Sequence, residues 1–204
     1  MTTVYLATDN PHKVEELSAM FEREALAIQV KSADEIGGMP EVEETEQTFE
    51  GNAMLKVEAL ASKVGPGNYA LADDSGLEVD ALQGAPGVIS ARFAGEDATD
   101  IQNLVKLMIL VSQIPEKKRG AQFVCSLVLM NSEGFSESYL GICRGVVIQE
   151  SRGDEGFGYD PMFIPGGYEL TFGELGWDVK SNISHRARAL QQLVSWFRKQ
   201  NKSG

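Results

Sequence analysis

The stretch NYALADDSGLEVDAL, residues 68–82, decides the fold because it joins two apolar runs through a pair of carboxylates. NYALA and GLEVDAL each have the length and composition of a buried β-strand. Successive side chains of a strand point to opposite faces. Asp73 and Asp74 can therefore reach one cleft only if the first strand ends between them, and the turn-forming pair Ser75 and Gly76 permits that end. We expect the strand to stop at the acidic pair.

Strands and helices are predicted on both sides of this stretch. A strand over residues 4–8 precedes a helix that Asn10 caps and Pro11 opens. Further along the chain we expect a strand at 27–32, a helix at about 48–64, a helix at 99–114, a hairpin at 121–149 that turns at NSEG, and a closing helix at about 184–199. Strand-helix units combined with a long hairpin predict an α/β fold on a mixed sheet with flanking helices.

Composition limits the classes of function. The chain has 204 residues, 43% of them hydrophobic, and we see no internal repeat or low-complexity linker, so we expect one folded domain over residues 1–204. A formal net charge of −12 argues against a nucleic-acid or membrane-surface binder, since either would carry a basic face. An anionic ligand must therefore be held by local cations.

The two cysteines, Cys125 and Cys143, lie far apart in apolar runs. This placement favours buried free thiols over a disulfide or a zinc site. The N-terminus lacks a basic stretch followed by an apolar one, and no apolar run approaches the roughly 20 residues of a membrane span. We expect a cytoplasmic protein.

Two predicted helices carry cations in their first turn, where the helix macrodipole favours acids. His12 and Lys13 open the first helix, and His185 and Arg186 open the last. Each such cation costs up to about 1 kcal/mol unless an anion sits at the helix end. We interpret both ends as phosphate or anion sites. The alternative is that these side chains are merely solvated.

The acidic pair predicts a metal site. Adjacent carboxylates repel one another unless a cation neutralises them. Mg²⁺ prefers oxygen ligands and usually takes one or two protein carboxylates, with waters and substrate phosphates completing its shell. The acidic loop at residues 41–53 offers Glu44 as a further ligand. The alternative is an ordinary acidic turn.

A glycine-rich segment, GDEGFGYDP at residues 153–161, offers Phe157 and Tyr159 to stack on a planar ring. The alternative is that both aromatic rings are packing anchors. The sequence contains neither a P-loop pattern nor a G-x-G-x-x-G run after a strand, so it does not support those nucleotide-binding folds.

Taken together, five stretches closely resemble the inosine triphosphate pyrophosphatase family. They are LATDNPHKVEEL (6–17), EETEQTFEGNAMLK (43–56), ALADDSGLEVDALQGAPGVISARFAGEDATD (70–100), GFGYDPMFIP (156–165) and KSNISHRARAL (180–190). The resemblance implies a two-lobed α/β fold around a long mixed sheet, an active site in the cleft between the lobes, Mg²⁺ dependence and a homodimer.

The resemblance also implies a role for particular residues. Residues 8–13 match a triphosphate-binding loop, with Lys56 and Lys180 as further phosphate cations. Glu44 and Asp74 match metal ligands, and Asp74 also matches the proton acceptor. The substrate-binding residues implied in this way are Thr8, Asp9, Asn10, Pro11, His12, Lys13, Lys56, Ser75, Phe157, Gly158, Tyr159, Asp160, Lys180, His185 and Arg186, of which Phe157 to Asp160 with His185 and Arg186 match the nucleobase pocket.

Two positions depart from the family pattern. Asp9 stands where glycine is common, and its charge beside a triphosphate is unfavourable unless it turns away. Gly173 stands where alanine is usual, which should only loosen a local turn.

The resemblance implies hydrolysis of inosine and xanthosine triphosphates, ribo or deoxyribo, to the monophosphate and pyrophosphate. Two alternatives stay open. One is a phosphatase with an aspartyl nucleophile, although that chemistry ordinarily uses Asp-x-Asp and this chain has Asp73 next to Asp74. The other is a nucleotide-sensing module of the same fold without turnover.

Overall fold

A computed structural model describes residues 2–8, 10–24 and 26–200. Six strands form one sheet in the order β2-β1-β3-β4-β5-β6. The strands are β1 (Thr2–Leu6), β2 (Ile28–Ser32), β3 (Tyr69–Val79), β4 (Gly120–Met130), β5 (Ser136–Val147) and β6 (Phe163–Pro165). β1 pairs in parallel with β2 and β3, whereas β5 and β6 are antiparallel. The predicted mixed sheet is therefore confirmed.

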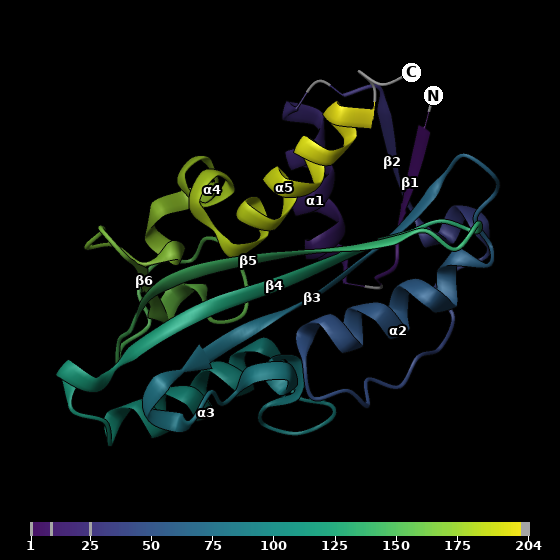
Figure 1. The fold of residues 1–204 in the computed structure, drawn as a ribbon. Helices are drawn as coiled ribbons and strands as arrows, with labels where there is room; N and C mark the ends of the chain where they lie inside the picture. The colour runs from purple at the N-terminus through teal and green to yellow at the C-terminus, as the bar shows by residue number, and fades with distance from the viewer. Residues whose placement is uncertain (1, 9, 25, 201–204) are drawn as a thin grey trace. The chain divides into compact units, whose positions relative to one another are not determined.

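Five α-helices flank the strands (Figure 1). They are α1 (Pro11–Arg23), α2 (Phe49–Ala61), α3 (Asp100–Ser112), α4 (Phe172–Ile183) and α5 (His185–Gln200). The side chain of Asn10 caps α1, that of Thr48 caps α2, and Thr99 forms a capping box with Gln102 at α3. These local signals were readable in the sequence. Among the described helices, none combines the length and apolarity that crossing a bilayer demands.

The chain divides into two compact units. Unit 1 comprises residues 1–74, 125–141 and 186–204, and unit 2 comprises residues 75–124 and 142–185. The chain passes from one unit to the other between Asp74 and Ser75 and again between His185 and Arg186, two pairs of predicted site residues. A single domain over residues 1–204 and an active cleft between two lobes stay predictions.

Unit 1 has an apolar cluster on each face of its strands. On one face, Leu71 of β3 packs with Leu17 of α1 and Leu193 of α5. On the other face, Ala70 and Ala72 pack with α2, which contributes Ala53, Val57, Leu60 and Ala61. In Figure 1, α1 and α5 lie on one side of these strands and α2 on the other. Because both faces are covered, the side chains of β3 from Ala70 to Asp74 are buried, whichever way they point.

Unit 2 has a single apolar cluster rich in aromatic rings. Phe123 of β4 packs edge-on against Phe163 of β6, and Phe172 of α4 stacks on Phe163. Leu107 and Val111 of α3 belong to the same cluster. The cluster fixes the segment that follows β5, which carries the glycine-rich stretch.

The structure corrects two sequence-based expectations about elements. β3 does not stop at the acidic pair. It is 11 residues long, from Tyr69 to Val79, and runs through the pair without a break. α4 was not predicted, because glycines at 173 and 176 weaken the helical pattern, and Gly176 has a positive φ inside the helix. Thr171 and Glu174 form a capping box that starts α4 nonetheless.

Gly173 is also more constrained than expected. A Cβ built on it would lie 2.7 Å from the carbonyl oxygen of Arg152, so a loop of unit 2 packs directly on this glycine. The expectation that Gly173 only loosens a local turn is therefore wrong for this chain.

Candidate active site

Asp73 and Asp74 point to opposite faces of β3, so the expectation that both reach one cleft is wrong. Both are buried, at 1% and 5% exposure. By the alternation of a strand, Asp73 shares the face of Leu71 and Asp74 shares the face of Ala72. The strand does not end at the pair, and the direct ion-pair partners of the two carboxylates differ: Arg186 and Lys13 for Asp73, and Lys56 for Asp74.

Asp73 belongs to a buried network with Arg186, Lys13 and Glu16, here called the Asp73 network. Its carboxylate lies 2.8 Å from Nε of Arg186 and 2.6 Å from Nζ of Lys13. Arg186 also forms an ion pair with Glu16. Two cations thus balance two carboxylates, and unpaired buried charge is avoided. The thiol of Cys125, 3.3 Å away, donates to Oδ2 of Asp73.

Charge balance sets the ionisation of this network. Burial alone would raise the pKa of Asp73, but the charges of Arg186 and Lys13 hold it well below its usual range. Burial, reinforced by the Asp73 charge, raises the pKa of the Cys125 thiol well above its usual range. Cys125 and Cys143 are both buried and free, as predicted. Asp73 and Arg186 are therefore ionised, and the thiol beside them is neutral.

The cations at the two helix starts have ion-pair partners within the chain. Arg186 is fully buried and forms ion pairs with Asp73 and Glu16. Lys13 likewise pairs with Asp73. His185 is buried and stacked on Phe123 at a centroid distance of 4.8 Å. Glu16 was missed in the sequence, where the signal was an acidic residue next to Leu17 on the apolar face of α1.

Asp74 belongs to a second group with Lys56 and Glu44, here called the Asp74 cluster. Nζ of Lys56 lies 2.7 Å from Oδ1 of Asp74 and 2.6 Å from Oε1 of Glu44. Two carboxylates share one cation, so the cluster carries a net charge of about −1 when all three groups are ionised. Oδ2 of Asp74 is buried and has no hydrogen-bond partner among the described residues. The hydrogen bonding of Asp74 is thus incomplete in the described chain.

The pKa shifts of the Asp74 cluster follow from this imbalance. Burial raises the pKa of Asp74, and the nearby lysine charges offset only part of the effect. Burial would lower the pKa of Lys56, but the charges of Asp74 and Glu44 raise it instead. Lys56 therefore stays protonated, and Asp74 is the member of the cluster best suited to accept a proton.

The donor set of the cluster suits a hard divalent cation. Among the described residues, no group of three or more His, Cys, Asp or Glu side chains is arranged to hold a metal. Mg²⁺, however, commonly takes only one or two protein carboxylates. Asp74, with its unpartnered oxygen, and Glu44 supply such a pair. A divalent cation there would offset the negative charge of the two carboxylates.

The predicted triphosphate loop lies at the start of α1. The hydroxyl oxygen of Thr8 accepts a hydrogen bond from the N–H of Asn10 at 3.2 Å. Oδ1 of Asn10 accepts from the N–H groups of His12 and Lys13. Pro11 has no N–H, so the first amides of the helix are already satisfied by the cap. Asp9 lies outside the described residues.

Four of the predicted nucleobase residues, Phe157 to Asp160, form a turn in unit 2, whereas Arg186 belongs to unit 1. Oδ2 of Asp160 lies 2.7 Å from Nζ of Lys180 and accepts the N–H of Phe157 at 2.9 Å. The Lys180 ammonium lies 4.6 Å from the centre of the Phe157 ring. Gly158 has a positive φ, and its N–H donates to Asp100. This part of the chain is therefore a turn held by hydrogen bonds and an ion pair to Asp160.

The two aromatic residues of this turn differ. Phe157 is only partly buried, so one part of its ring is accessible. Tyr159 is buried, and its hydroxyl donates to the carbonyl of Ser90 at 2.8 Å. Tyr159 is accordingly a packing anchor, and Phe157 alone is left to stack on a ligand ring. Ser75, partly buried, follows Asp74 directly in β3.

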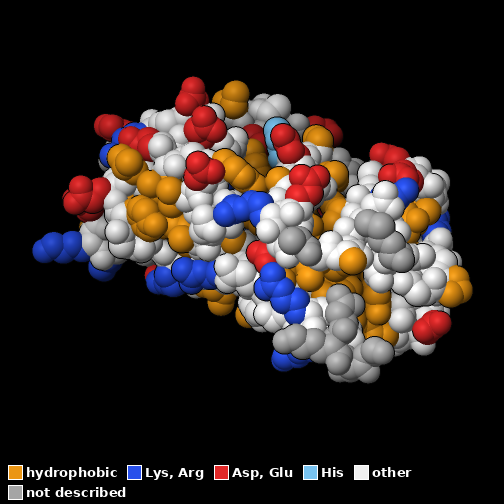
Figure 2. Space-filling view, turned by 90° about the horizontal axis from the view of Figure 1, so that it is seen from above, with side chains coloured by type: hydrophobic (Ala, Val, Ile, Leu, Met, Phe, Trp, Pro, Cys, Tyr) orange, Lys and Arg blue, Asp and Glu red, His pale blue; other side chains and the backbone are white. Residues whose placement is uncertain are grey.

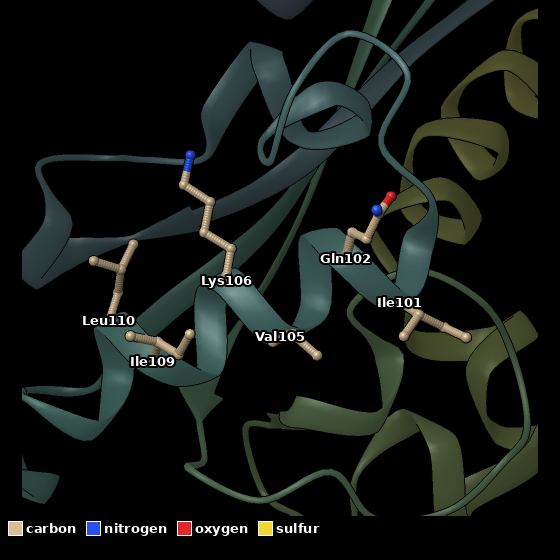
Figure 3. A pocket seen from close by; sticks show the side chains of 6 residues that line it. All are labelled: Ile101, Gln102, Val105, Lys106, Ile109 and Leu110. Atoms are coloured by element: carbon tan, nitrogen blue, oxygen red, sulfur yellow. The ribbon is translucent and has the colours of Figure 1, made fainter.

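A surface groove on α3 contains none of the predicted site residues. Ile101, Gln102, Val105, Lys106, Ile109 and Leu110 line it (Figure 3). On the face shown in Figure 2, basic side chains are interspersed with acidic and hydrophobic ones. The chemistry predicted from the sequence thus lies in the buried polar groups, not in this groove.

The mixed sheet and its flanking helices define an α/β protein with a polar cluster formed by Asp74 of β3, Lys56 of α2 and Glu44. The chain belongs to the Ham1 family, whose sequence model matches residues 4–196. This result confirms the resemblance carried by the five stretches.

Similar proteins cover nearly the whole chain. A dITP/XTP pyrophosphatase of Opitutus terrae is 46% identical, over 96% of this chain and 98% of its own length. One of Desulforamulus reducens is also 46% identical, over 93% of this chain and 92% of its own. Among solved structures, a HAM1 protein from Coxiella burnetii has a TM-score of 0.86 at 36% identity, covering 98% of this chain and all 100% of its own. The Ham1 protein of Staphylococcus aureus has a TM-score of 0.84 at 34% identity, with coverage of 98% and 100%.

Proposed function

We propose that this protein hydrolyses noncanonical purine nucleoside triphosphates, ITP and XTP with their deoxy forms, to the nucleoside monophosphate and pyrophosphate. Relatives that carry the name dITP/XTP pyrophosphatase match it at 46% identity over nearly their full length. The observation that carries the proposal is the buried Oδ2 of Asp74, which has no hydrogen-bond partner in the described chain and lies in a cluster with Lys56 and Glu44. A metal ion bound at that cluster would give this oxygen a partner.

The cation that fits this cluster is Mg²⁺, held by Asp74 and Glu44. When bound, it would polarise the phosphate oxygens and neutralise charge that develops on them. Lys56 keeps both carboxylates in place, since its ammonium contacts each of them. Mg²⁺ dependence can be tested by titrating the ion against activity.

Asp74 is proposed to accept the proton of the attacking water. The water oxygen forms a bond to the α-phosphorus, the bond from that phosphorus to the bridging oxygen of the β-phosphate breaks, and the electron pair leaves with pyrophosphate. Burial raises the pKa of Asp74, which makes its carboxylate a better base than an ordinary aspartate. Positioning and charge neutralisation do the rest, as in other phosphoryl chemistry.

The phosphate contacts are proposed for Lys13 and Lys56 with the loop at residues 8–13. Both lysines are engaged by carboxylates within the chain, so a triphosphate has to share them. The N–H groups of His12 and Lys13 are taken by Asn10, which leaves side chains as the contacts of this loop. Asp9, where the family commonly has glycine, belongs to the same loop.

The base contacts are proposed for the turn around Asp160. Phe157 stacks on the purine, and stacking alone cannot separate one purine from another. Discrimination then rests on hydrogen bonds to the 6-oxo group of inosine or xanthine, donated by the backbone of residues 157–160, by Lys180 or by His185. Arg186 can contribute only its backbone, because Asp73 and Glu16 hold its guanidinium.

The test is a comparison of kcat/KM for inosine, xanthosine, guanosine and adenosine triphosphates at one Mg²⁺ concentration, with separate detection of pyrophosphate and orthophosphate. We expect pyrophosphate release, with inosine triphosphate preferred over ATP by roughly 10⁴-fold, because a polar contact of this kind rejects an analogue that cannot make it. Orthophosphate release would indicate an aspartyl phosphatase, and binding without product would indicate a sensing module.

The homodimer and the cytoplasmic location belong to the same proposal. Light scattering on the purified protein tests the first, and fractionation of cells tests the second. The homodimer is implied by the family resemblance, and the cytoplasmic location is the expectation drawn above from the N-terminal sequence and the length of the apolar runs.

A further inference from the structure

Glu44 lies in a segment without regular secondary structure. Residues 41–46 form neither helix nor strand, and α2 begins only at Phe49. A carboxylate that binds a metal has to be held in place, and a segment without a hydrogen-bonded ladder does not do this by itself. The contacts of the neighbouring residues show what holds it.

Asn52 fastens this segment to α2. Its Oδ1 accepts the backbone N–H of Glu46 at 2.9 Å, two residues after Glu44. The side chain of Glu46 packs against Gly51, where an added Cβ would lie 2.7 Å from the Cβ of Glu46. The segment therefore lies directly on the first turn of α2, and residues 51 and 52 both define its position.

The Asn52 side chain lies on the same helix face as Lys56. Residues four apart in an α-helix are neighbours on its surface. The Lys56 ammonium forms an ion pair with the Glu44 carboxylate, and the Asn52 side chain accepts a hydrogen bond from the backbone N–H of Glu46. One face of α2 thus contacts the segment at two points, at Glu44 and at Glu46.

Simple packing does not account for an asparagine at this position. Asn52 is fully buried, and its Nδ2 has no hydrogen-bond partner among the described residues. A buried donor without a partner destabilises the folded state. Asn103 in α3 shows the alternative, a buried asparagine with both amide atoms bonded to backbone, since Nδ2 donates to Ala91 and Oδ1 accepts from Ala94.

We propose that Asn52 is a positioning residue that holds Glu44, through the Glu46 backbone, in the place where it binds the divalent cation. This inference rests on the proposed metal site. Asn52 itself does not need to touch metal or substrate. Removal of an outer-shell contact of this kind typically costs about 10- to 100-fold in metal affinity.

The experiment measures Mn²⁺ binding to the free protein by electron paramagnetic resonance, together with the Mg²⁺ concentration for half-maximal pyrophosphate release. Asn52→Ala removes the hydrogen bond to Glu46. Gly51→Ala leaves Asn52 intact but inserts a methyl group where Glu46 packs. Both variants should weaken Mn²⁺ binding about 10- to 100-fold and raise the Mg²⁺ requirement in parallel, with a smaller change in KM at saturating Mg²⁺.

Asn103→Ala is the matched control. It removes a buried asparagine that fastens a loop in unit 2, so it should lower the melting temperature without changing Mn²⁺ affinity. Unchanged Mn²⁺ affinity in folded Asn52→Ala overturns the proposal. If Asn52→Ala does not fold, Gly51→Ala decides in its place. Wild-type protein that binds Mn²⁺ but releases no pyrophosphate contradicts the proposed function alone, because the binding comparison still tests Asn52.

Discussion

The Asp73 network and the Asp74 cluster begin at neighbouring residues of one strand, yet they differ in nearly every physical respect. Asp73 faces two cations, which it shares with a single further carboxylate, Glu16. Asp74 shares one cation, Lys56, with Glu44, and one of its oxygens has no partner within the described chain. Asp73 thus forms ion pairs with two cations, whereas Asp74 forms an ion pair with Lys56 and has a buried oxygen without a hydrogen-bond partner in the described chain.

The difference teaches that charge balance, more than burial, separates a structural carboxylate from a chemical one. Both aspartates are buried. Compensation lowers the pKa of Asp73, whereas incomplete compensation leaves the pKa of Asp74 raised by burial. A group that the protein has not satisfied is available for a ligand. The following changes test this contrast, from the largest expected effect to the smallest.

Asp74→Asn should lower pyrophosphate release by about 10²- to 10⁴-fold, because loss of a general base or metal ligand has effects of that size. The fold should be kept, since the variant cluster pairs one lysine with one carboxylate. Steady-state kinetics and a thermal melt check the two parts. Turnover close to that of the wild type would show that Asp74 is neither the proton acceptor nor a required metal ligand.

Arg186→Leu should destabilise the free protein by about 3–5 kcal/mol, because Asp73 and Glu16 would remain buried without the guanidinium that pairs with both. Urea unfolding measures the loss. Arg144→Leu is the control, since Arg144 forms a two-pronged pair with Asp80 at the surface. Exposed pairs contribute about 0–1 kcal/mol. Similar losses in the two variants would contradict a structural role for the Asp73 network.

Lys13→Met should destabilise the free protein by roughly 1.5–3 kcal/mol, the usual contribution of a hydrogen bond to a charged group. A lysine in the first turn opposes the helix dipole, but its contact with buried Asp73 outweighs that cost. Urea unfolding without nucleotide is the measurement. A stability equal to or above that of the wild type would mean that the ion pair of Lys13 with Asp73 does not stabilise the free protein.

The pH dependence of stability should separate the two aspartates by sign. Despite burial, Arg186 and Lys13 lower the pKa of Asp73, so its contribution is complete above the unfolded-state pKa of about 3.9 and is lost as pH falls through the folded-state pKa. Burial raises the pKa of Asp74, so its ionised form penalises the folded state increasingly as pH rises from about 3.9.

Two variants measure these signs in urea unfolding without divalent ions. The destabilisation by Asp73→Asn should shrink as pH falls below about 4. The stability of Asp74→Asn relative to wild type should increase as pH rises above about 4. Parallel pH profiles for the two variants would mean that the two carboxylates do not differ.

Much of the fold was readable in the sequence, because its signals are local. Asn10 and Thr48 cap the helices that they were expected to precede, and the inner residues Leu190, Leu193 and Phe197 of α5 are buried. Where local signals conflict with packing, the sequence misled. Ser75 and Gly76 suggested a turn, but Gly76 instead lets residues 87–90 approach β3, since an added Cβ would lie 2.3 Å from Oγ of Ser90.

The sequence by itself determined most of the elements, with α4 as an exception, and which polar residues are unusual, since caps and periodicity act over a few residues. It singled out Asp73, Asp74 and Arg186 without assigning their partners. Only the tertiary structure decided those, because charge compensation depends on side chains far apart in the chain: Arg186 is 113 residues from Asp73. Sequence spacing cannot show which of two adjacent carboxylates forms ion pairs with two cations and which forms an ion pair with one. That difference distinguishes Asp73, in a buried ion-pair network, from Asp74, the proposed catalytic residue.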